Sequence, residues 1–299
     1  MKDIVVILGP TASGKSALAL ALSEQIDCEL ISADSMQIYK KMDVGTAKPR
    51  KKELDAVKHH MIDIVFPDEA FSVADFQKQS FDIVKKLHDQ NKTPVFVGGT
   101  GLYINSIVYD LDFTSTPSSE AFRAEMEKIK AEKGLDYLYE LMKQKDEKAA
   151  TRIHANDEKR IIRRLEVIEN QGADAPFDFL KQREDYNFKI IGLNCDRSVL
   201  YDRINLRVDN MINNGLFEEV KSLYEQYGGK IKALKAIGYK EIIAHFNGEY
   251  DKDEAIRLVK RNSRRFAKRQ ITWFKRDTRI KWYDILEKNC LKSAISGIK

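Results

Sequence analysis

The feature that most constrains the fold is the octapeptide Gly-Pro-Thr-Ala-Ser-Gly-Lys-Ser at residues 9–16. Five aliphatic residues, 4–8, precede it, and an apolar run of that length predicts a strand buried on both faces. The Ala and Leu residues at 17–22 follow it and predict a helix. Strand, glycine-bracketed loop, Lys-Ser and helix in this order indicate a phosphate-binding loop. The sequence therefore predicts an α/β fold with a P-loop NTPase-like parallel sheet flanked by helices.

The chemistry of this loop suits a phosphate-bearing ligand. Gly9 and Gly14 allow a sharp turn and a close backbone approach to phosphate oxygens. The loop amides and the helix N-terminus attract an anion, Lys15 adds a full charge, and the Ser16 hydroxyl can bind Mg²⁺. A glycine-rich loop that arose by chance would have to match all four fixed positions of this motif and also stand between a strand and a helix. The match therefore favours the phosphate-loop interpretation. The predicted phosphate-binding residues are Gly9, Pro10, Thr11, Ala12, Ser13, Gly14, Lys15 and Ser16.

Composition and cysteine usage exclude several classes of protein. The 299 residues are 32% charged and 43% hydrophobic, as expected for a globular protein of one or two domains. The N-terminus lacks the layout of a secretory signal, and no apolar run is long enough to span a membrane. Cys28, Cys195 and Cys290 are too far apart to indicate a disulfide framework or a zinc site. We therefore expect a cytoplasmic protein that does not bind membranes.

A second short strand is predicted at 29–33, and it leads into Asp34-Ser35-Met36-Gln37. Ligands of open α/β sheets lie beyond the carboxyl ends of the strands. Asp34 would thus lie near the phosphate loop if this strand is parallel to the first and neighbours it. Alternatively, Asp34 caps a turn or helix that begins at Ser35. Position alone does not decide between these roles.

A third buried strand, 93–97, ends in Gly98-Gly99-Thr100-Gly101. Many phosphate-loop ATPases and GTPases place a magnesium-binding Asp at the end of such a strand. The two glycines here would permit close approach to a ligand, and Thr100 offers a hydroxyl. A simple tight turn would explain the glycines equally well.

The adjacent histidines His59 and His60 are poor candidates for a shared metal site. Neighbouring residues of a strand point to opposite faces, so the two rings could not easily bind one ion. We expect structural or supporting roles for them.

Between the two parts of the predicted core, 1–112 and 188–299, lies a predicted helical insertion at 113–187. Its start is the polar, linker-like run 114–119, and residues 120–170 carry many charges without a strand pattern. A helix at 158–170, capped by Asn156-Asp157, is the clearest element. Its charged residues are Lys159, Arg160, Arg163 and Arg164, and its apolar side has Ile161, Ile162, Leu165 and Ile168. A solvated helix face is the usual explanation of such a basic run.

Two predicted helices that follow the helical insertion carry further cations. A helix at 197–213 places Arg203 and Arg207 on one face, where they pair with acidic neighbours or reach over the phosphates. A helix at 252–276 has ten Lys and Arg against two acidic residues. Its expected packing stripe is Ile256, Val259, Ser263, Phe266, Gln270 and Trp273, and its expected cationic face is Arg257, Arg261, Arg264 and Lys268. The imbalance favours a polyanionic partner larger than the ligand of the loop.

The chain resembles the tRNA dimethylallyltransferase, or tRNA isopentenyltransferase, family. The likeness rests on the loop at 9–16, on Asp-Ser-Met-Gln-Ile-Tyr-Lys at 34–40 and on Met-Asp-Val-Gly-Thr-Ala-Lys-Pro at 42–49. It continues with the following motifs: Gly-Gly-Thr-Gly-Leu-Tyr at 98–103, Ile-His-Ala-Asn-Asp-Glu-Lys-Arg at 153–160, Arg-Arg-Leu-Glu-Val at 163–167, Gly-Tyr-Lys-Glu at 238–241 and Ala-Lys-Arg-Gln-Ile-Thr-Trp-Phe at 267–274. The family loop often has Thr at the position of Ser16, and the hydroxyl is retained.

The resemblance implies a reaction and its participants. A dimethylallyl group would move from dimethylallyl diphosphate to N6 of the adenosine on the 3′ side of the anticodon, releasing diphosphate. The enzyme would be a monomer that binds Mg²⁺ through Ser16 and recognises the anticodon stem-loop of tRNA. Asp34, Thr100 and Lys15 would be catalytic, with Asp34 as general base, and Arg207 would bind the diphosphate. The implied tRNA contacts are Asp34, Ser35, Met36, Gln37, Thr100, Arg123, Lys159, Arg160, Ile161, Ile162 and Arg163.

Other functional classes use some of the same features. A small-molecule kinase would bind ATP in the loop, but the missing Asp after the third strand and the basic helices argue against it. A transferase that prenylates free adenine nucleotides would not need the helical insertion or the basic C-terminal helix. A third class is an RNA-binding module that uses a nucleotide as a switch, and it would not turn over an allylic diphosphate.

Overall fold

The computed structural model describes residues 1–111, 119–172 and 181–298. The chain divides into two compact units. The first, which we call the sheet unit, comprises Met1–Val108 and Arg183–Lys299, and the helical unit comprises Tyr109–Gln182. The insertion was expected at 113–187, and residues 114–118 of its predicted linker lie outside the described residues.

The sheet unit is built on a six-stranded parallel sheet with the strand order β3-β2-β4-β1-β5-β6. Its strands are β1 (Asp3–Leu8), β2 (Cys28–Ala33), β3 (His59–His60), β4 (Thr93–Gly98), β5 (Asn187–Asn194) and β6 (Lys281–Asp284). The apolar run of β1 is buried on both faces, as the sequence predicted, and β2 is buried along its whole length as well. This arrangement confirms the predicted fold class.

The strand order corrects one expectation. We expected the strand that precedes Asp34 to neighbour β1, but β4 lies between β1 and β2. Leu8 of β1 pairs with Gly98 of β4, which pairs with Ala33 of β2, so the three strands end level with one another. Asp34 and the phosphate loop therefore leave the same edge of the sheet from strands two positions apart. With about 4.8 Å between neighbouring strands, that separation is roughly 10 Å.

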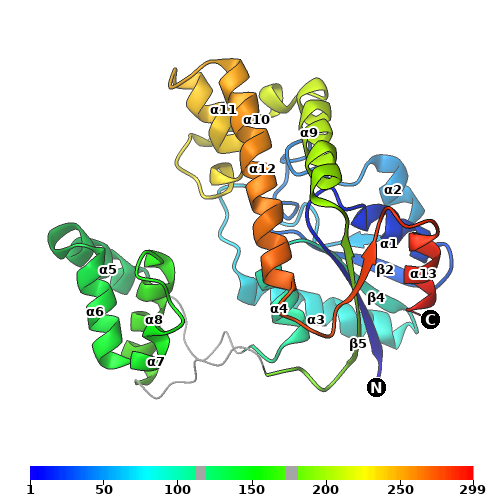
Figure 1. Cartoon of the computed structure of the whole chain (residues 1–299), viewed down its shortest axis with the longest axis horizontal. Helices are drawn as coiled ribbons and strands as arrows, with labels where there is room; N and C mark the ends of the chain where they lie inside the picture. Colours follow the sequence, from blue (N-terminus) through cyan, green and yellow to red (C-terminus); the bar gives the residue numbers. More distant parts are fainter. Residues whose placement is uncertain (112–118, 173–180, 299) are drawn as a thin grey trace. The chain divides into compact units, whose positions relative to one another are not determined.

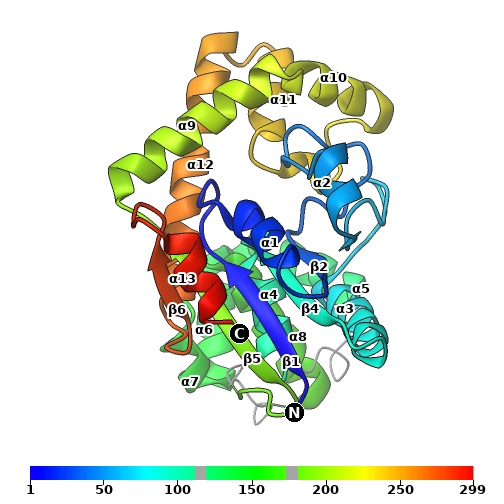
Figure 2. The same cartoon turned by 90° about the vertical axis from the view of Figure 1, so that its right-hand side faces the viewer.

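Helices cover both faces of this sheet (Figures 1 and 2). One face has α1 (Lys15–Ser23), packed beside α13 (Cys290–Ser296) over a shared apolar cluster that includes Val5 and Ile7. The other face has α3 (Val73–Asp89) and α4 (Gly101–Val108), which contact each other. A short helix, α2 (Lys51–Ala56), precedes β3. Helices on both faces are the expected result when right-handed crossovers run in both directions from the middle of a parallel sheet.

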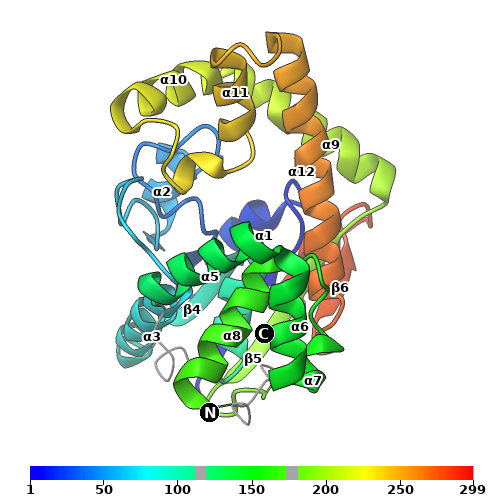
Figure 3. The ribbon, with the colours of Figure 1, turned by 90° about the vertical axis from the view of Figure 1, so that its left-hand side faces the viewer.

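The connection from β5 to β6 is a long helical excursion that ends in α12 (Figure 3). Its elements are α9 (Arg197–Asn213), α10 (Leu216–Tyr227), the 3₁₀ helix η1 (Ala233–Lys235), α11 (Tyr239–Phe246) and α12 (Lys252–Phe274). Along its length α12 contacts α11, α9 and α4. Its predicted stripe is correct at Val259 and Gln270, but Phe266 is exposed. Ala267 is buried instead, because the buried face is rotated by one residue at this turn.

The helical unit contains α5 (Glu120–Lys133), α6 (Leu135–Lys145), α7 (Glu147–Ala150) and α8 (Glu158–Gln171). Apolar side chains of α5, α6 and α8 form its core, among them Met126, Leu138 and Ile161. The side chain of Asp157 accepts a hydrogen bond from the backbone N of Arg160, so the predicted cap of α8 is confirmed. None of the helices in the described part of the chain combines the length and apolar character that crossing a membrane requires.

Candidate active site

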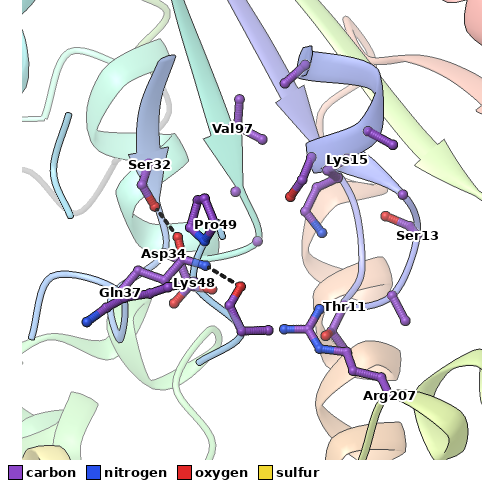
Figure 4. Close-up of a pocket in the computed structure, with 18 of the residues that line it drawn as sticks. Thr11, Ser13, Lys15, Ser32, Asp34, Gln37, Lys48, Pro49, Val97 and Arg207 are labelled. Atoms are coloured by element: carbon purple, nitrogen blue, oxygen red, sulfur yellow. Dashed lines mark hydrogen bonds between the residues drawn. The ribbon is translucent and has the colours of Figure 1, made fainter. Parts of the chain in front are cut away.

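A cleft of about 690 Å³ opens at the carboxyl ends of the central strands of the sheet unit. Its walls come from segments that are far apart in the sequence (Figure 4). They include the phosphate loop, Asp34 and Gln37, residues 47–50, Val97–Gly99 and the α9 arginines Arg203 and Arg207. The cleft thus lies where the sequence analysis placed a ligand, beyond the ends of parallel strands.

The phosphate loop needs both of its glycines. Gly9 has φ +150°, and a Cβ there would lie 2.4 Å from the carbonyl oxygen of Leu193 on the neighbouring strand. Gly14 has φ +86°, a left-handed conformation that glycine adopts without strain, and it directly precedes α1. The first amides of α1 therefore face the cleft, where they can bind an anion. The Oγ of Ser13 is buried and lacks a hydrogen-bond partner among the described residues.

Lys15 is the central cation of the cleft. Its Nζ donates a hydrogen bond to the carbonyl oxygen of Pro10 at 2.6 Å, which folds the side chain back over the loop. Burial and the neighbouring Arg207 guanidinium lower the pKa of Lys15 to about 7, while the Asp34 carboxylate acts in the opposite direction. An anion bound in the loop would restore the charged ammonium.

The two arginines of α9 reach the cleft in different ways. Arg203 is exposed, and its Nε donates to the carbonyl oxygen of Ala12 at 2.9 Å, so it holds the phosphate loop from outside. Arg207 points into the cleft beside Lys15 (Figure 4). Burial lowers the pKa of Arg207, and Asp34 opposes this effect. The sequence analysis offered two roles for Arg203 and Arg207, pairing with acidic neighbours or reaching over bound phosphates. These contacts agree with the second role.

Asp34 stands on the opposite wall of the cleft and shapes a turn. Its Oδ1 accepts a hydrogen bond from the backbone N of Met36 at 2.9 Å, an Asx-turn geometry. The idea that Asp34 caps a helix is wrong, because residues 35–39 form turns and a single bridge. One carboxylate oxygen supports the turn, and the side chain lines the cleft.

The other residues predicted around Asp34 form a hydrogen-bonded wall. Thr100 Oγ1 accepts from the backbone N of Ser35 at 2.9 Å, so its hydroxyl lies beside the Asp34 turn. Ser32 Oγ donates to Gln37 Oε1 at 2.9 Å, and Gln37 Nε2 donates to the carbonyl oxygen of Ala47 at 3.3 Å. Asp34 and Gln37 line the cleft directly. The structure thus brings Thr100 and the residues of the 34–37 turn together, and their catalytic and tRNA-binding roles stay predictions.

The glycines at the end of β4 and just after it allow close packing within the protein. A Cβ on Gly98 would lie 2.2 Å from the carbonyl oxygen of Ala33, and one on Gly99 would lie 2.3 Å from Nε2 of Gln270. At Gly101 the obstacle is the ring of Trp273, at 2.5 Å. The space on the Cβ side of these glycines is occupied by β2 and by α12. The backbone of Gly98 and Gly99 also lines the cleft, so close approach to a ligand stays a prediction.

A loop that forms another wall of the cleft is held by contacts that include Glu219 and Asp63, two residues that the sequence analysis did not identify. Glu219 of α10 accepts hydrogen bonds from three successive backbone amides, at residues 43–45, and a fourth from the hydroxyl of Tyr239. Lys48 bonds the carboxylates of Asp43 and Asp63. The sequence pattern gives no indication that Glu219 holds this loop, because Glu219 lies 176 residues from Asp43.

His59 and His60 have the structural roles that we expected. His59 Nδ1 bonds the carbonyl oxygen of Val57 at 2.8 Å, and His60 Nε2 bonds Oε2 of the buried Glu29 at 2.6 Å. The two rings therefore have separate partners. Within the described ranges, we find no group of three or more His, Cys, Asp or Glu that could hold a metal ion.

In the helical unit, burial limits which of the predicted tRNA contacts can come from side chains. Ile161 is fully buried and Ile162 is 7% exposed, so their side chains belong to the core of the unit, and tRNA contact at these two positions stays a prediction. Arg164 is 4% exposed and pairs with Asp146, which removes it from the predicted charged face. Lys159 and Arg160 are exposed, as the prediction requires.

Arg123 and Arg163 of the helical unit share one buried acid. Arg163 Nη1 lies 2.6 Å and Arg123 Nη2 3.1 Å from Oε2 of Glu166. These bonds help to lower the pKa of Glu166, against the opposing effect of burial. Both guanidinium groups remain partly exposed and are held in place by the buried carboxylate.

On α12 the predicted cationic face is confirmed at Arg257 and Lys268, which are exposed, and is wrong at Arg261 and Arg264. Arg261 and Arg264 are half-buried, and Arg264 Nη1 donates to Asn205 of α9 at 2.6 Å. Four exposed cations near the C-terminal end of the helix line a shallow groove together with Thr272 and the partly buried Trp273. They are Arg265, Lys268, Arg269 and Arg276.

The comparisons with known proteins agree with one another. A family model described as IPP transferase matches residues 37–277. A tRNA dimethylallyltransferase of Bacillus licheniformis is 46% identical over 94% of this chain and 90% of its own, and one of Alkaliphilus oremlandii is 48% identical over 95% and 92%.

Solved structures give the same result. The full-length tRNA isopentenylpyrophosphate transferase of Bacillus halodurans is 40% identical and superposes with a TM-score of 0.75 over 100% of this chain and 97% of its own. A eukaryotic dimethylallyltransferase acting on tRNA is 26% identical, with a TM-score of 0.81 over 95% of this chain and 74% of its own.

Proposed function

The chain belongs to the IPP transferase family and is a tRNA-modifying transferase, and from this we propose how its cleft works. The donor is dimethylallyl diphosphate, and the acceptor is N6 of the adenosine on the 3′ side of the anticodon. The products are the prenylated tRNA and diphosphate.

The observation that carries this proposal is the arrangement of charge across the cleft. Lys15 and Arg207 stand on the wall formed by the phosphate loop, and Asp34 stands on the opposite wall, with the end of β4 between them. Two strand spacings, roughly 10 Å, separate the walls. Such a gap admits a diphosphate on the cationic side and an amine on the carboxylate side, with the allylic carbon between them.

The chemistry follows from these positions. The bond between the allylic carbon and the diphosphate oxygen breaks, and its electron pair leaves with the diphosphate. Lys15, Arg207 and the loop amides are oriented in advance toward that developing charge. The adenosine N6 forms the new bond to carbon, and the Asp34 carboxylate takes the proton that N6 loses. Thr100 acts on the same side by holding the turn of Asp34 through the amide of Ser35.

Mg²⁺ is the proposed cofactor, and the donor set of the cleft suits it. Ser16 is exposed on the first turn of α1 and offers one hydroxyl oxygen. Mg²⁺ commonly keeps several waters and binds substrate phosphates with only one or two protein ligands. When bound, it would neutralise part of the charge on the leaving diphosphate.

The RNA partner is proposed to bind cations in both units. In the sheet unit these are the exposed residues of the α12 groove, Arg265, Lys268, Arg269 and Arg276. In the helical unit they are Arg123 and Arg163, fixed by Glu166, together with Lys159 and Arg160. An anticodon loop presents unpaired bases that can be turned out of the stack into the cleft. We further propose that the enzyme acts as a monomer in the cytoplasm.

The test is incubation of the protein with labelled dimethylallyl diphosphate and unmodified tRNA. We expect label in the tRNA at the adenosine next to the anticodon, with one diphosphate released per group transferred, and none with Lys15→Ala. Transfer to AMP but not to tRNA would instead identify a nucleotide prenyltransferase. Phosphate transfer from ATP to a nucleoside without prenylation would identify a kinase.

A further inference from the structure

We propose that Gln270 is a positioning residue that sets the spacing between the donor wall and the acceptor wall of the cleft, an inference that rests on the proposed function. Gln270 lies on α12, and its side chain is 6% exposed. Its Oε1 accepts a hydrogen bond from the backbone N of Thr11 at 2.9 Å, and its Nε2 donates to the carbonyl oxygen of Gly99 at 2.8 Å. One side chain thus joins the phosphate loop to the loop after β4.

Past the strand ends, the backbone N of Thr100 donates to the carbonyl oxygen of Ala33 at 3.1 Å and ties the loop after β4 to the end of β2, but the paired register of β1 and β4 stops before the phosphate loop. Pairing of β1 with β4 and of β4 with β2 ends at Leu8, Gly98 and Ala33. Beyond this line the reacting groups stand on separate loops. The amide of Gln270 supplies a bridge between two of them, and only a side chain with both a donor and an acceptor can make both bonds.

The bridge continues to the proposed base. Gly99 immediately precedes Thr100, and Thr100 Oγ1 accepts from the backbone N of Ser35, next to Asp34. A Cβ on Gly99 would lie 2.3 Å from Nε2 of Gln270, so the backbone at this position is held tightly against the amide. A chain of hydrogen bonds and peptide units therefore leads from the diphosphate loop to the carboxylate.

The same part of α12 is anchored on one side and exposed on the other. Trp273 packs against Gly101, where a Cβ would meet its ring at 2.5 Å, and its Nε1 donates to Asn105 Oδ1 at 3.3 Å. The neighbouring residues Lys268 and Arg269 are exposed cations of the α12 groove. RNA bound to these cations would contact the same helix whose Gln270 holds the donor wall and the acceptor wall at their spacing.

The consequence is a specific kinetic defect. A misplacement of about 1 Å between reacting groups can cost on the order of 10²-fold in rate. Loss of the bridge should therefore slow the transfer step and leave each substrate free to bind its own wall. Replacing a residue that only stabilises the fold would not slow the transfer step while leaving the binding of both substrates unchanged.

The main test is Gln270→Leu, which removes both bonds and keeps a similar volume. We expect single-turnover transfer to fall by roughly 10²-fold, with the dissociation constants of dimethylallyl diphosphate and of tRNA each changed by less than about threefold. The matched control is Gln77→Leu, since Gln77 Nε2 donates to the carbonyl oxygen of Ser106 at 2.9 Å, a bond between α3 and α4. The control should lose thermal stability and keep its transfer rate.

Gln270→Glu gives a second readout if the leucine variant does not fold. The introduced carboxyl can accept from Thr11, but only its protonated form can donate to Gly99. Burial raises the pKa of a carboxyl group, so the transfer rate of this variant relative to wild type should rise as pH falls from 8 to 6.

Three outcomes would overturn the proposal: a leucine variant that loses stability but keeps its transfer rate, a collapse of substrate affinity in that variant, or a flat pH response of the glutamate variant. Failure of the wild-type protein to prenylate tRNA would instead refute the proposed function, because each Gln270 measurement is made relative to an active wild type.

Discussion

Binding of the diphosphate donor should take up a proton, because Lys15 is held in a partly neutral state before the ligand arrives. Its pKa is lowered from 10.5 to about 7 by burial and by the adjacent Arg207. A bound diphosphate adds negative charge beside the ammonium and returns the pKa toward its ordinary value. The protein must therefore gain a proton on binding at any pH between these two values.

The magnitude follows from the size of the shift. At pH 8, one unit above the lowered pKa, about nine in ten molecules carry a neutral Lys15. Binding should then take up close to one proton, and the association constant should fall by about tenfold for each further pH unit. Below pH 6 the side chain is already charged, so the contribution of Lys15 to the pH dependence should vanish there.

Calorimetry with dimethylallyl diphosphate, in two buffers of different ionisation enthalpy, measures the proton uptake directly. The titration is done at pH 8 to 9, where the terminal phosphate of the ligand is fully ionised. The matched variant is Lys15→Arg, whose guanidinium stays charged across this range, so it should bind with no proton uptake and no pH slope. Uptake near zero in the wild type, or equal uptake in the arginine variant, would refute the assignment of Lys15 as a neutralised cation of the diphosphate site.

Two further predictions concern the acceptor side. Asp34→Asn keeps an oxygen that can accept from Met36 and so preserves the turn, but it cannot take the amine proton. Its transfer rate should therefore fall by on the order of 10² to 10⁴ while binding of dimethylallyl diphosphate is unchanged, and near-normal turnover would exclude Asp34 as the base. Arg265→Ala and Arg269→Ala should each weaken tRNA binding and flatten its salt dependence by about one unit. The control is Lys221→Ala, on the exposed face of α10, which should leave the salt dependence of tRNA binding unchanged. If all three variants show the same salt dependence, the α12 groove is not part of the RNA-binding site.

Much of the site could be predicted because its signals are local. The phosphate loop is specified by eight consecutive residues and by the strand and helix that flank them. The need for glycine at two of its positions and the burial of the flanking strand can therefore be predicted from adjacent residues alone. The cap at Asp157 and the apolar strands are local in the same sense. Family motifs linked Asp34 and Thr100 to the same reaction, and the structure places the Thr100 hydroxyl against Ser35, next to Asp34.

Other features depend on contacts between distant segments. The sequence pattern did not show that β4 separates β1 from β2, because strand order is set by how crossovers and helices pack over the whole sheet. Periodicity placed Phe266 in the buried stripe, although a rotation of one residue at that turn of α12 exposes it. The glycines after β4 indicated close approach but could not identify the side chains that approach them.

At the cleft, the amino-acid sequence accounts for the chemical groups, and the tertiary structure accounts for the distances between them. The sequence determined the chemical groups: a cationic loop, a carboxylate at a strand end and a basic helix. The tertiary structure decided their spacing, through the level ends of β1, β4 and β2 and through Gln270, which bonds Thr11 across 259 residues of sequence. Local patterns report which face of an element is buried, whereas the distance between two loops depends on the register and packing of every element between them.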